Sequence, residues 1–182
     1  MSKDTHSSEF YTYQNCIFKV NATKRTPVRK DILKKILDQL IATSTYHHKL
    51  FIFRFDLHIK EYTNNNKVIT DFNRRLFKKV KRHYKVKRIG YVWVREQEKS
   101  KKQHYHYVLI LDGSKVNSPH SLQTWISAIW SFDDGTCHWS QYYNISRAEL
   151  GSVTHHLSYL AKTRGKGYRP PQTKDFGSSR IK

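Results

Sequence analysis

The chain has 182 residues, of which 37% are hydrophobic, so it can form one domain with a buried core. Its 34 Lys and Arg residues against 14 Asp and Glu residues give a formal net charge of +20. This charge predicts a polyanionic partner, with nucleic acid as the default. No apolar run approaches the roughly 18 residues of a membrane span, and there is no signal-peptide pattern. We therefore expect a cytoplasmic protein that binds no membrane, with Cys16 and Cys137 as reduced thiols.

Residues 1–49 are expected to form an N-terminal arm and one helix. Residues 1–24 are mostly polar with a weak apolar patch, which predicts an arm lying on the domain. Thr26-Pro27 predicts a helix start, since proline is favoured at the first helical position. Apolar residues recur at helical spacing from Ile32 to Ile41. Residues 50–182 are expected to form the main part of one compact unit.

From Leu50 onward, strand and helix patterns follow one another. The expected elements are strands at 50–58, 89–97, 104–111 and 137–145, helices at 68–84, from 118 and from 147 to about 163, and turns at Glu98–Gln103 and Asp134-Gly135. The last helix begins at a capping box, Ser146-Arg147-Ala148-Glu149. The order β-α-β-β-α-β plus a helix predicts an α+β, ferredoxin-like or RRM-like split βαβ fold. Its antiparallel sheet should have helices on one face and the other face open.

A possible metal site lies on the third expected strand. His104 and His106 point to the same side of a strand, and Glu96 can lie beside them if the second and third strands form a hairpin. Two imidazoles and a carboxylate can hold Mg²⁺ or Mn²⁺ and leave positions open for a phosphate oxygen. The alternative is that both histidines are partly exposed sheet residues that stack on tyrosines. The strand by itself leaves both interpretations open.

The last expected helix carries a tyrosine and a lysine one turn apart. Its apolar stripe consists of Leu150, Val153, Leu157, Leu160 and Ala161. Tyr159 lies nearly opposite this stripe, flanked by His155, His156 and Lys162. The pattern therefore places Tyr159 on the surface or in a polar cleft, and not in the core.

These motifs together resemble the HUH endonuclease superfamily, which includes rolling-circle replication initiators, relaxases and related transposases. Its members share an apolar first strand, a His-hydrophobe-His strand and a helix-borne tyrosine, matched here by residues 50–58, 104–106 and 159–162. Glu96 stands eight residues before His104, the offset of a metal-binding glutamate in several single-tyrosine members. Over residues 50–182 the chain is most similar to the inovirus-type replication proteins of filamentous phages and prophages. It departs from the pattern at Tyr105, where an aliphatic residue is usual.

The resemblance implies a mechanism and a set of residue roles. A metal ion on His104, His106 and Glu96 polarises the scissile phosphodiester. Tyr159 attacks it to give a 5′-phosphotyrosine and a free 3′-hydroxyl, while Lys162 stabilises the developing charge. Single-stranded origin DNA is the implied substrate, and Tyr168 is the fallback nucleophile. Basic residues expected to contact DNA are Arg54, Arg74, Arg75, Lys78, Lys79, Lys81, Arg82 and Arg95.

The preferred hypothesis is a monomeric, metal-dependent nickase and ligase that initiates rolling-circle replication of a phage, prophage or plasmid-like element. A host helicase and polymerase would be partners, because the chain has no P-loop motif of its own. The alternatives are a non-catalytic, basic RRM-like module that binds single strands, and a transposase or relaxase. For the basic helix, a solvated surface is the alternative to a DNA contact. Asp56 and His58 are further candidates for supporting or replacing a metal ligand.

Overall fold

A five-stranded antiparallel sheet forms the centre of the protein, for which the computed structural model describes residues 4–97, 102–131 and 135–182. The strand order is β8-β5-β7-β6-β9. The bounds are β5 (Lys49–His58), β6 (Gly90–Glu96), β7 (His104–Asp112), β8 (Thr136–Ser146) and β9 (Phe176–Ser178). Without β9, this is the split βαβ order, and the predicted α+β class is confirmed. Glu98 and Asp134, both expected in turns, lie outside the described residues.

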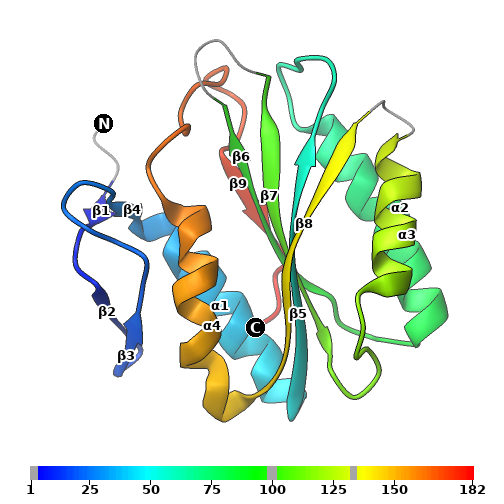
Figure 1. The fold of residues 1–182 in the computed structure, drawn as a ribbon, viewed down its shortest axis with the longest axis horizontal. Helices are drawn as coiled ribbons and strands as arrows, with labels where there is room; N and C mark the ends of the chain where they lie inside the picture. The colour runs from blue at the N-terminus through cyan, green and yellow to red at the C-terminus, as the bar shows by residue number, and fades with distance from the viewer. Residues whose placement is uncertain (1–3, 98–101, 132–134) are drawn as a thin grey trace.

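One face of the sheet is covered by α2 (Lys67–Tyr84) and α3 (His120–Trp130), as Figure 1 shows. Alternate residues of β5, from Phe51 to Leu57, point into this layer and are fully buried. They pack on apolar residues of both helices, including Phe72 and Ile126. The alternation of β5 and the helical spacing of α2 predicted this layer correctly.

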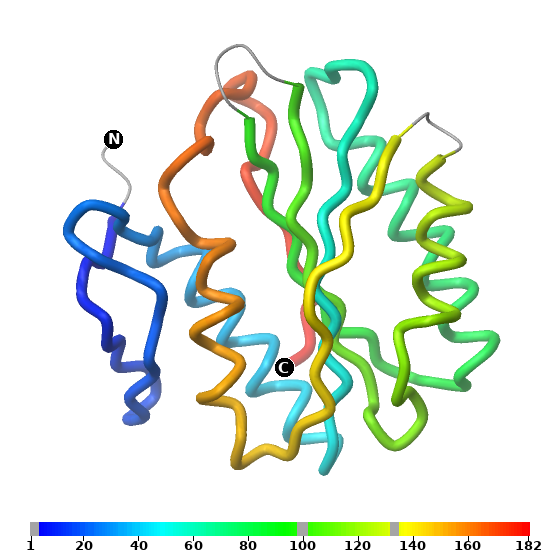
Figure 2. Tube along the Cα trace, viewed as in Figure 1, coloured from blue at the N-terminus to red at the C-terminus, as the bar shows by residue number. Residues whose placement is uncertain are grey.

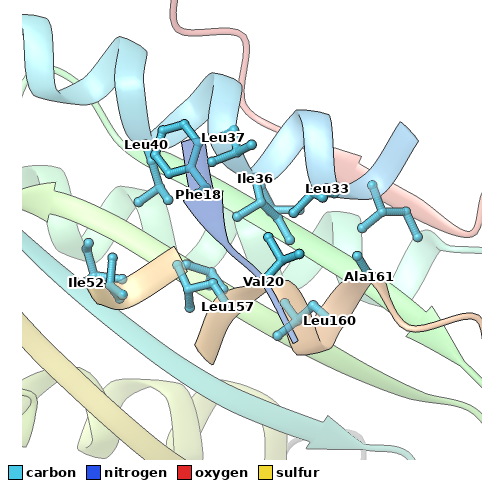
Figure 3. Packing of buried hydrophobic residues seen from close by; sticks show 14 of the residues in the cluster. Phe18, Val20, Leu33, Ile36, Leu37, Leu40, Ile52, Leu157, Leu160 and Ala161 are labelled. Carbon is cyan, nitrogen blue, oxygen red and sulfur yellow. The ribbon is translucent and has the colours of Figure 1, made fainter. Parts of the chain in front are cut away.

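The other face is covered by α1 (Lys30–Tyr46) and α4 (Leu150–Leu157), so the prediction of an open face is wrong over most of the sheet. Figure 3 shows side chains of α1, of the α4 region and of Phe18 and Val20 gathered in one cluster over β5 residue Ile52. The apolar stripe of α1 needs a partner, and this face provides it. Farther along the same face, β5 and β7 carry the polar side chains of Asp56 and His106 in place of apolar ones.

The N-terminal segment lies beside α1 and α4 (Figures 1 and 2). β1 (Thr5–His6) pairs with β4 (Val28–Arg29), and β2 (Phe10–Tyr13) forms a hairpin with β3 (Cys16–Lys19). The expected helix start at Thr26-Pro27 is wrong, since α1 begins at Lys30. Val28 and Arg29 belong to a strand pair instead, so the chain becomes helical only after that pair ends. Among the described helices, none is long and apolar enough to cross a membrane.

The last helix is shorter than expected. The predicted capping box is present, because the carboxylate of Glu149 accepts hydrogen bonds from the backbone N–H and the hydroxyl of Ser146, both at 2.8 Å. The box opens a 3₁₀ turn, η2 (Arg147–Glu149), which leads into α4. A second 3₁₀ turn, η3 (Ser158–Ala161), follows α4, and the backbone is already extended at Lys162. Tyr159 therefore lies in η3, and Lys162 lies beyond the helical residues.

Candidate metal and tyrosine site

Polar side chains gather where β5 ends, β6 ends and β7 begins. In the β6–β7 ladder Glu96 pairs with His104, so the predicted neighbourhood of the glutamate and the histidine pair is confirmed. In the β5–β7 ladder Asp56 pairs with His106 and His58 pairs with His104. Because side chains alternate along a strand, all five of these residues lie on the face that α1 and α4 cover farther along the sheet.

Three of these side chains converge on one point. Oε2 of Glu96 lies 2.6 Å from Nε2 of His106 and 3.3 Å from Nε2 of His104. The two Nε2 atoms are 3.3 Å apart. All three ligand atoms lie within 4.8 Å of one another, and they form the group of potential metal ligands found among the described residues. The sequence predicted these same three residues.

Asp56 is hydrogen-bonded to the ring nitrogen of His106 that points away from Glu96. Its Oδ1 lies 2.7 Å from Nδ1 of His106, which leaves Nε2 of that ring directed at Glu96. A carboxylate on the distal nitrogen fixes the tautomer of a ligating imidazole. Asp56 is therefore placed to support His106, and it lies outside the group of potential metal ligands. His58 stacks on His104, with ring centroids 4.9 Å apart.

The charges of the group are strongly coupled. Burial by itself would raise the pKa of Glu96, but hydrogen bonds from both histidines and the charge of Lys166 lower the pKa well below its ordinary value. Burial raises and the His106 hydrogen bond lowers the pKa of Asp56, with a net lowering. Burial opposes charge on His106, yet its bonds to Asp56 and Glu96 raise the pKa of that imidazole. Both carboxylates therefore favour the protonated form of His106 when no metal is bound.

The donor set fits a divalent cation. Two imidazole nitrogens and one carboxylate oxygen suit Mg²⁺ or Mn²⁺ when phosphate and water complete the coordination. A cation at this point would replace the proton that His106 shares with Glu96, as expected for ligands that bind metal in deprotonated form. A small cavity of about 220 Å³ opens at the group and is lined by Glu96, His104, His106, Tyr159, Lys162 and Arg164.

Tyr159 reaches this cavity from η3. Its side chain is 41% exposed, and its ring centroid lies 6.1 Å from that of His106. The four apolar neighbours Val153, Leu157, Leu160 and Ala161 are fully buried, so the predicted position of Tyr159 opposite an apolar stripe is confirmed. Two cations flank the ring, with the guanidinium carbon of Arg54 at 4.9 Å and Nζ of Lys162 at 5.6 Å from its centroid. Nζ of Lys162 also lies 3.2 Å from Oγ1 of Thr26.

Lys166 and Gly165 belong to the site but were not singled out from the sequence. The side chain of Lys166 is only 2% exposed, and its Nζ lies 3.1 Å from Oε1 of Glu96. The carbonyl of Gly165 accepts a hydrogen bond of 2.7 Å from the backbone N–H of Gln97. The segment after Tyr159 therefore closes over the carboxylate of Glu96. Glycines at 165 and 167 were the available signal for a tight return of the chain.

Arg54 is hydrogen-bonded to His156, which the sequence identified only as a residue flanking Tyr159. Its Nη1 lies 2.7 Å from Nε2 of His156, and Nδ1 of His156 lies 2.8 Å from the hydroxyl of Tyr143. Burial and the charge of Arg54 lower the pKa of His156. His155 is exposed and lies near Glu9, the residue before β2, so it is not part of this group.

The structure buries one of the expected DNA contacts, Arg95, and places the six on α2 away from Tyr159. Arg95 is 2% exposed and donates to the backbone carbonyls of Thr63 and Asn65, so it anchors a loop and cannot contact DNA in this conformation. The basic residues of α2 are exposed, but α2 covers the opposite face of the sheet from the metal group. The structure therefore does not bring Arg74, Arg75, Lys78, Lys79, Lys81 and Arg82 to Tyr159.

Comparison with known proteins identifies one family. Residues 12–132 match the family described as the YagK/YfjJ C-terminal domain. The matched range includes Glu96, His104 and His106, and it ends before Tyr159. No curated protein and no solved structure shows significant similarity to the chain.

Proposed function

The chain belongs to the YagK/YfjJ C-terminal domain family, and we propose that it is an endonuclease that nicks and rejoins single-stranded DNA through Tyr159. The observation that carries this proposal is the shared cavity. It brings a Glu-His-His group from β6 and β7 together with a tyrosine from η3, more than 50 residues later in the chain. The resemblance to HUH endonucleases, and to inovirus-type replication proteins in particular, rests on the same residues.

The proposed reaction is a reversible transesterification. The phenol oxygen of Tyr159 bonds to the scissile phosphorus, and the bond from phosphorus to the 3′-oxygen breaks. The phenol loses a proton and the 3′-oxygen gains one, so the products are a 5′-phosphotyrosine and a 3′-hydroxyl. A later 3′-hydroxyl can attack the phosphotyrosine and restore both the DNA strand and the free tyrosine.

Residues in the cavity and beside it have separate roles in this reaction. A Mg²⁺ or Mn²⁺ ion bound by Glu96, His104 and His106 would polarise the phosphodiester and screen its charge. Arg54 and Lys162 supply positive charge next to the phenol ring, where negative charge develops during attack. The net charge of +20 favours the approach of a polyanion.

A non-catalytic RRM-like module is the weaker candidate. Such a module needs exposed aromatic rings on an open sheet face for base stacking. Here Tyr105 and Tyr107 are fully buried under α2 and α3, and α1 and α4 cover most of the other face. Initiation of rolling-circle replication in a host cytoplasm, with a host helicase and polymerase, is the proposed setting. A transposase or relaxase would use the same chemistry.

The proposal is tested by trapping the covalent intermediate. The protein is incubated with Mn²⁺ and single-stranded oligonucleotides tiled over the DNA that flanks its gene, and adducts are separated on a denaturing gel. We expect Tyr159→Phe to abolish the adduct while single-strand binding stays nearly unchanged, because only the nucleophilic oxygen is lost.

Tyr168→Phe is the matched control, since Tyr168 is 45% exposed and lines a neighbouring cavity together with Tyr159. This variant should form adducts as the unmodified protein does. Adducts that persist in Tyr159→Phe and vanish in Tyr168→Phe would move the nucleophile to Tyr168. No adduct with any tiled strand would reject the proposed function.

A further inference from the structure

We infer that His156 and Tyr143 are positioning residues that hold Arg54 beside Tyr159 as a cation that forms no direct ion pair with a described carboxylate. The inference rests on the proposed function and assigns roles within the same site. It concerns residues on three different elements: Arg54 on β5, Tyr143 on β8 and His156 on α4.

The hydrogen bonds around His156 run in one direction. A guanidinium can only donate, so Nε2 of His156 must accept the 2.7 Å bond from Nη1 of Arg54. The ring proton then lies on Nδ1, which donates to the hydroxyl of Tyr143 at 2.8 Å. The hydroxyl of Tyr143 in turn donates to Oε1 of Gln141 at 2.6 Å. This chain of bonds fixes one tautomer of a neutral imidazole.

The partner of Arg54 is unusual for a buried arginine. The residue is 9% exposed, and its Nε has no hydrogen-bond partner. Among the described residues, no carboxylate oxygen lies within 4.0 Å of its guanidinium. Asp56 is near enough for the charge of Arg54 to contribute to its lowered pKa, but its Oδ1 is hydrogen-bonded to His106 and not to Arg54. A neutral imidazole therefore occupies the place where a carboxylate would normally cancel the charge.

A cation without a direct carboxylate partner is useful at this position. The guanidinium carbon lies 4.9 Å from the centre of the Tyr159 ring. Negative charge develops on the phenol oxygen and the phosphate as the new bond forms, and a fixed nearby cation stabilises that charge. A direct ion pair between Arg54 and a carboxylate would cancel much of this stabilisation. The low pKa of His156, caused by burial and by Arg54, keeps the imidazole neutral and able to accept the bond.

Three variants separate positioning from a general structural effect. His156→Ala removes the acceptor, whereas His156→Gln keeps an acceptor oxygen for Arg54 and a donor N–H for Tyr143. His155→Ala is the control, because His155 is the exposed neighbour of the same residue type on α4. The measurements are the rate constant of adduct formation at saturating DNA and Mn²⁺, the affinity for single-stranded DNA, and the melting temperature.

We expect His156→Ala to slow adduct formation about tenfold, the effect of losing one hydrogen bond to a charged group. His156→Gln should restore most of the rate, and His155→Ala should match the unmodified protein. DNA affinity should change little in all three. Equal rates for the two alanine variants would overturn the inference, as would a rate for His156→Gln as low as that for His156→Ala.

A measurement without DNA tests the network independently of the proposed function. ¹⁵N NMR of the imidazoles should show His156 neutral at pH 7 with its proton on Nδ1, assigned by loss of the signal in His156→Gln. Arg54→Met should raise the pKa of His156, because the neighbouring cation is gone. A proton on Nε2, or a charged ring at pH 7, would overturn the inference. If no DNA adduct forms at all, the proposed function fails while this result still stands.

Discussion

Gly165 provides the sharpest test of the metal site, because a second glycine serves as its control. Both Gly165 and Gly167 have left-handed backbone angles, with φ of +68° and +95°. A methyl group at 165 would lie 3.0 Å from Cδ and Oε1 of Glu96 and closer still to its Cγ, whereas one at 167 would meet nothing within 4 Å. Substitution by alanine thus strains the backbone at both positions but displaces Glu96 at only one.

The magnitudes follow from these two contributions. A left-handed alanine costs about 1–2 kcal/mol, which corresponds to a fall in melting temperature of about 2–8 °C for a chain of this size. We expect this loss in both variants when measured in the presence of a chelator. Gly165→Ala should in addition weaken Mn²⁺ binding about 10–100-fold, the range typical of disturbing the groups that orient a metal ligand.

The assay is a Mn²⁺ titration that follows the free ion by electron paramagnetic resonance. It needs no DNA, so it tests the site whether or not the chain cleaves DNA. Gly167→Ala should bind Mn²⁺ as the unmodified protein does. Equal affinities in the two variants would show that the segment after Tyr159 does not control Glu96, and would refute the role given to the close approach of Gly165.

Three further predictions concern the metal ligands, pH and salt. His104→Ala combined with His106→Ala should abolish Mn²⁺ binding and adduct formation in a folded protein; an unchanged Mn²⁺ titration would exclude the site. The pKa of His106 is raised above its ordinary value of 6.5 in the metal-free protein, so its stabilising contribution is complete below pH 6.5 and is lost as pH rises through the raised value. The melting temperature should therefore fall in that range, less so in Asp56→Asn, and Mn²⁺ should prevent the fall; a flat profile would contradict this. Single-strand binding should weaken with salt at a slope of about −0.7 per phosphate contact. Neutral replacements of four basic residues on α2 should flatten that slope without moving the nicked position; the four are Lys78, Lys79, Lys81 and Arg82. An unchanged slope would mean that this helix faces solvent.

The sequence alone determined the local geometry of the site. The two-residue period of a strand put His104 and His106 on one face, and the short connection between two strands put Glu96 beside them. The helical period likewise separated Tyr159 from its buried neighbours. These features depend on residues close together in the chain, so periodicity and pairing are enough to predict them.

Only the tertiary structure decided which distant segments meet. The apolar stripe of α1 was visible, but its packing on the supposedly open face depends on the shape and area of the whole core. The contact of Lys166 with Glu96 spans 70 residues, and that of His156 with Arg54 spans 102. No spacing rule reaches that far, because such contacts are set by how helices and loops pack around the sheet. The same packing placed basic α2 on the far face and buried Arg95, although the sequence marked both only as positive charge.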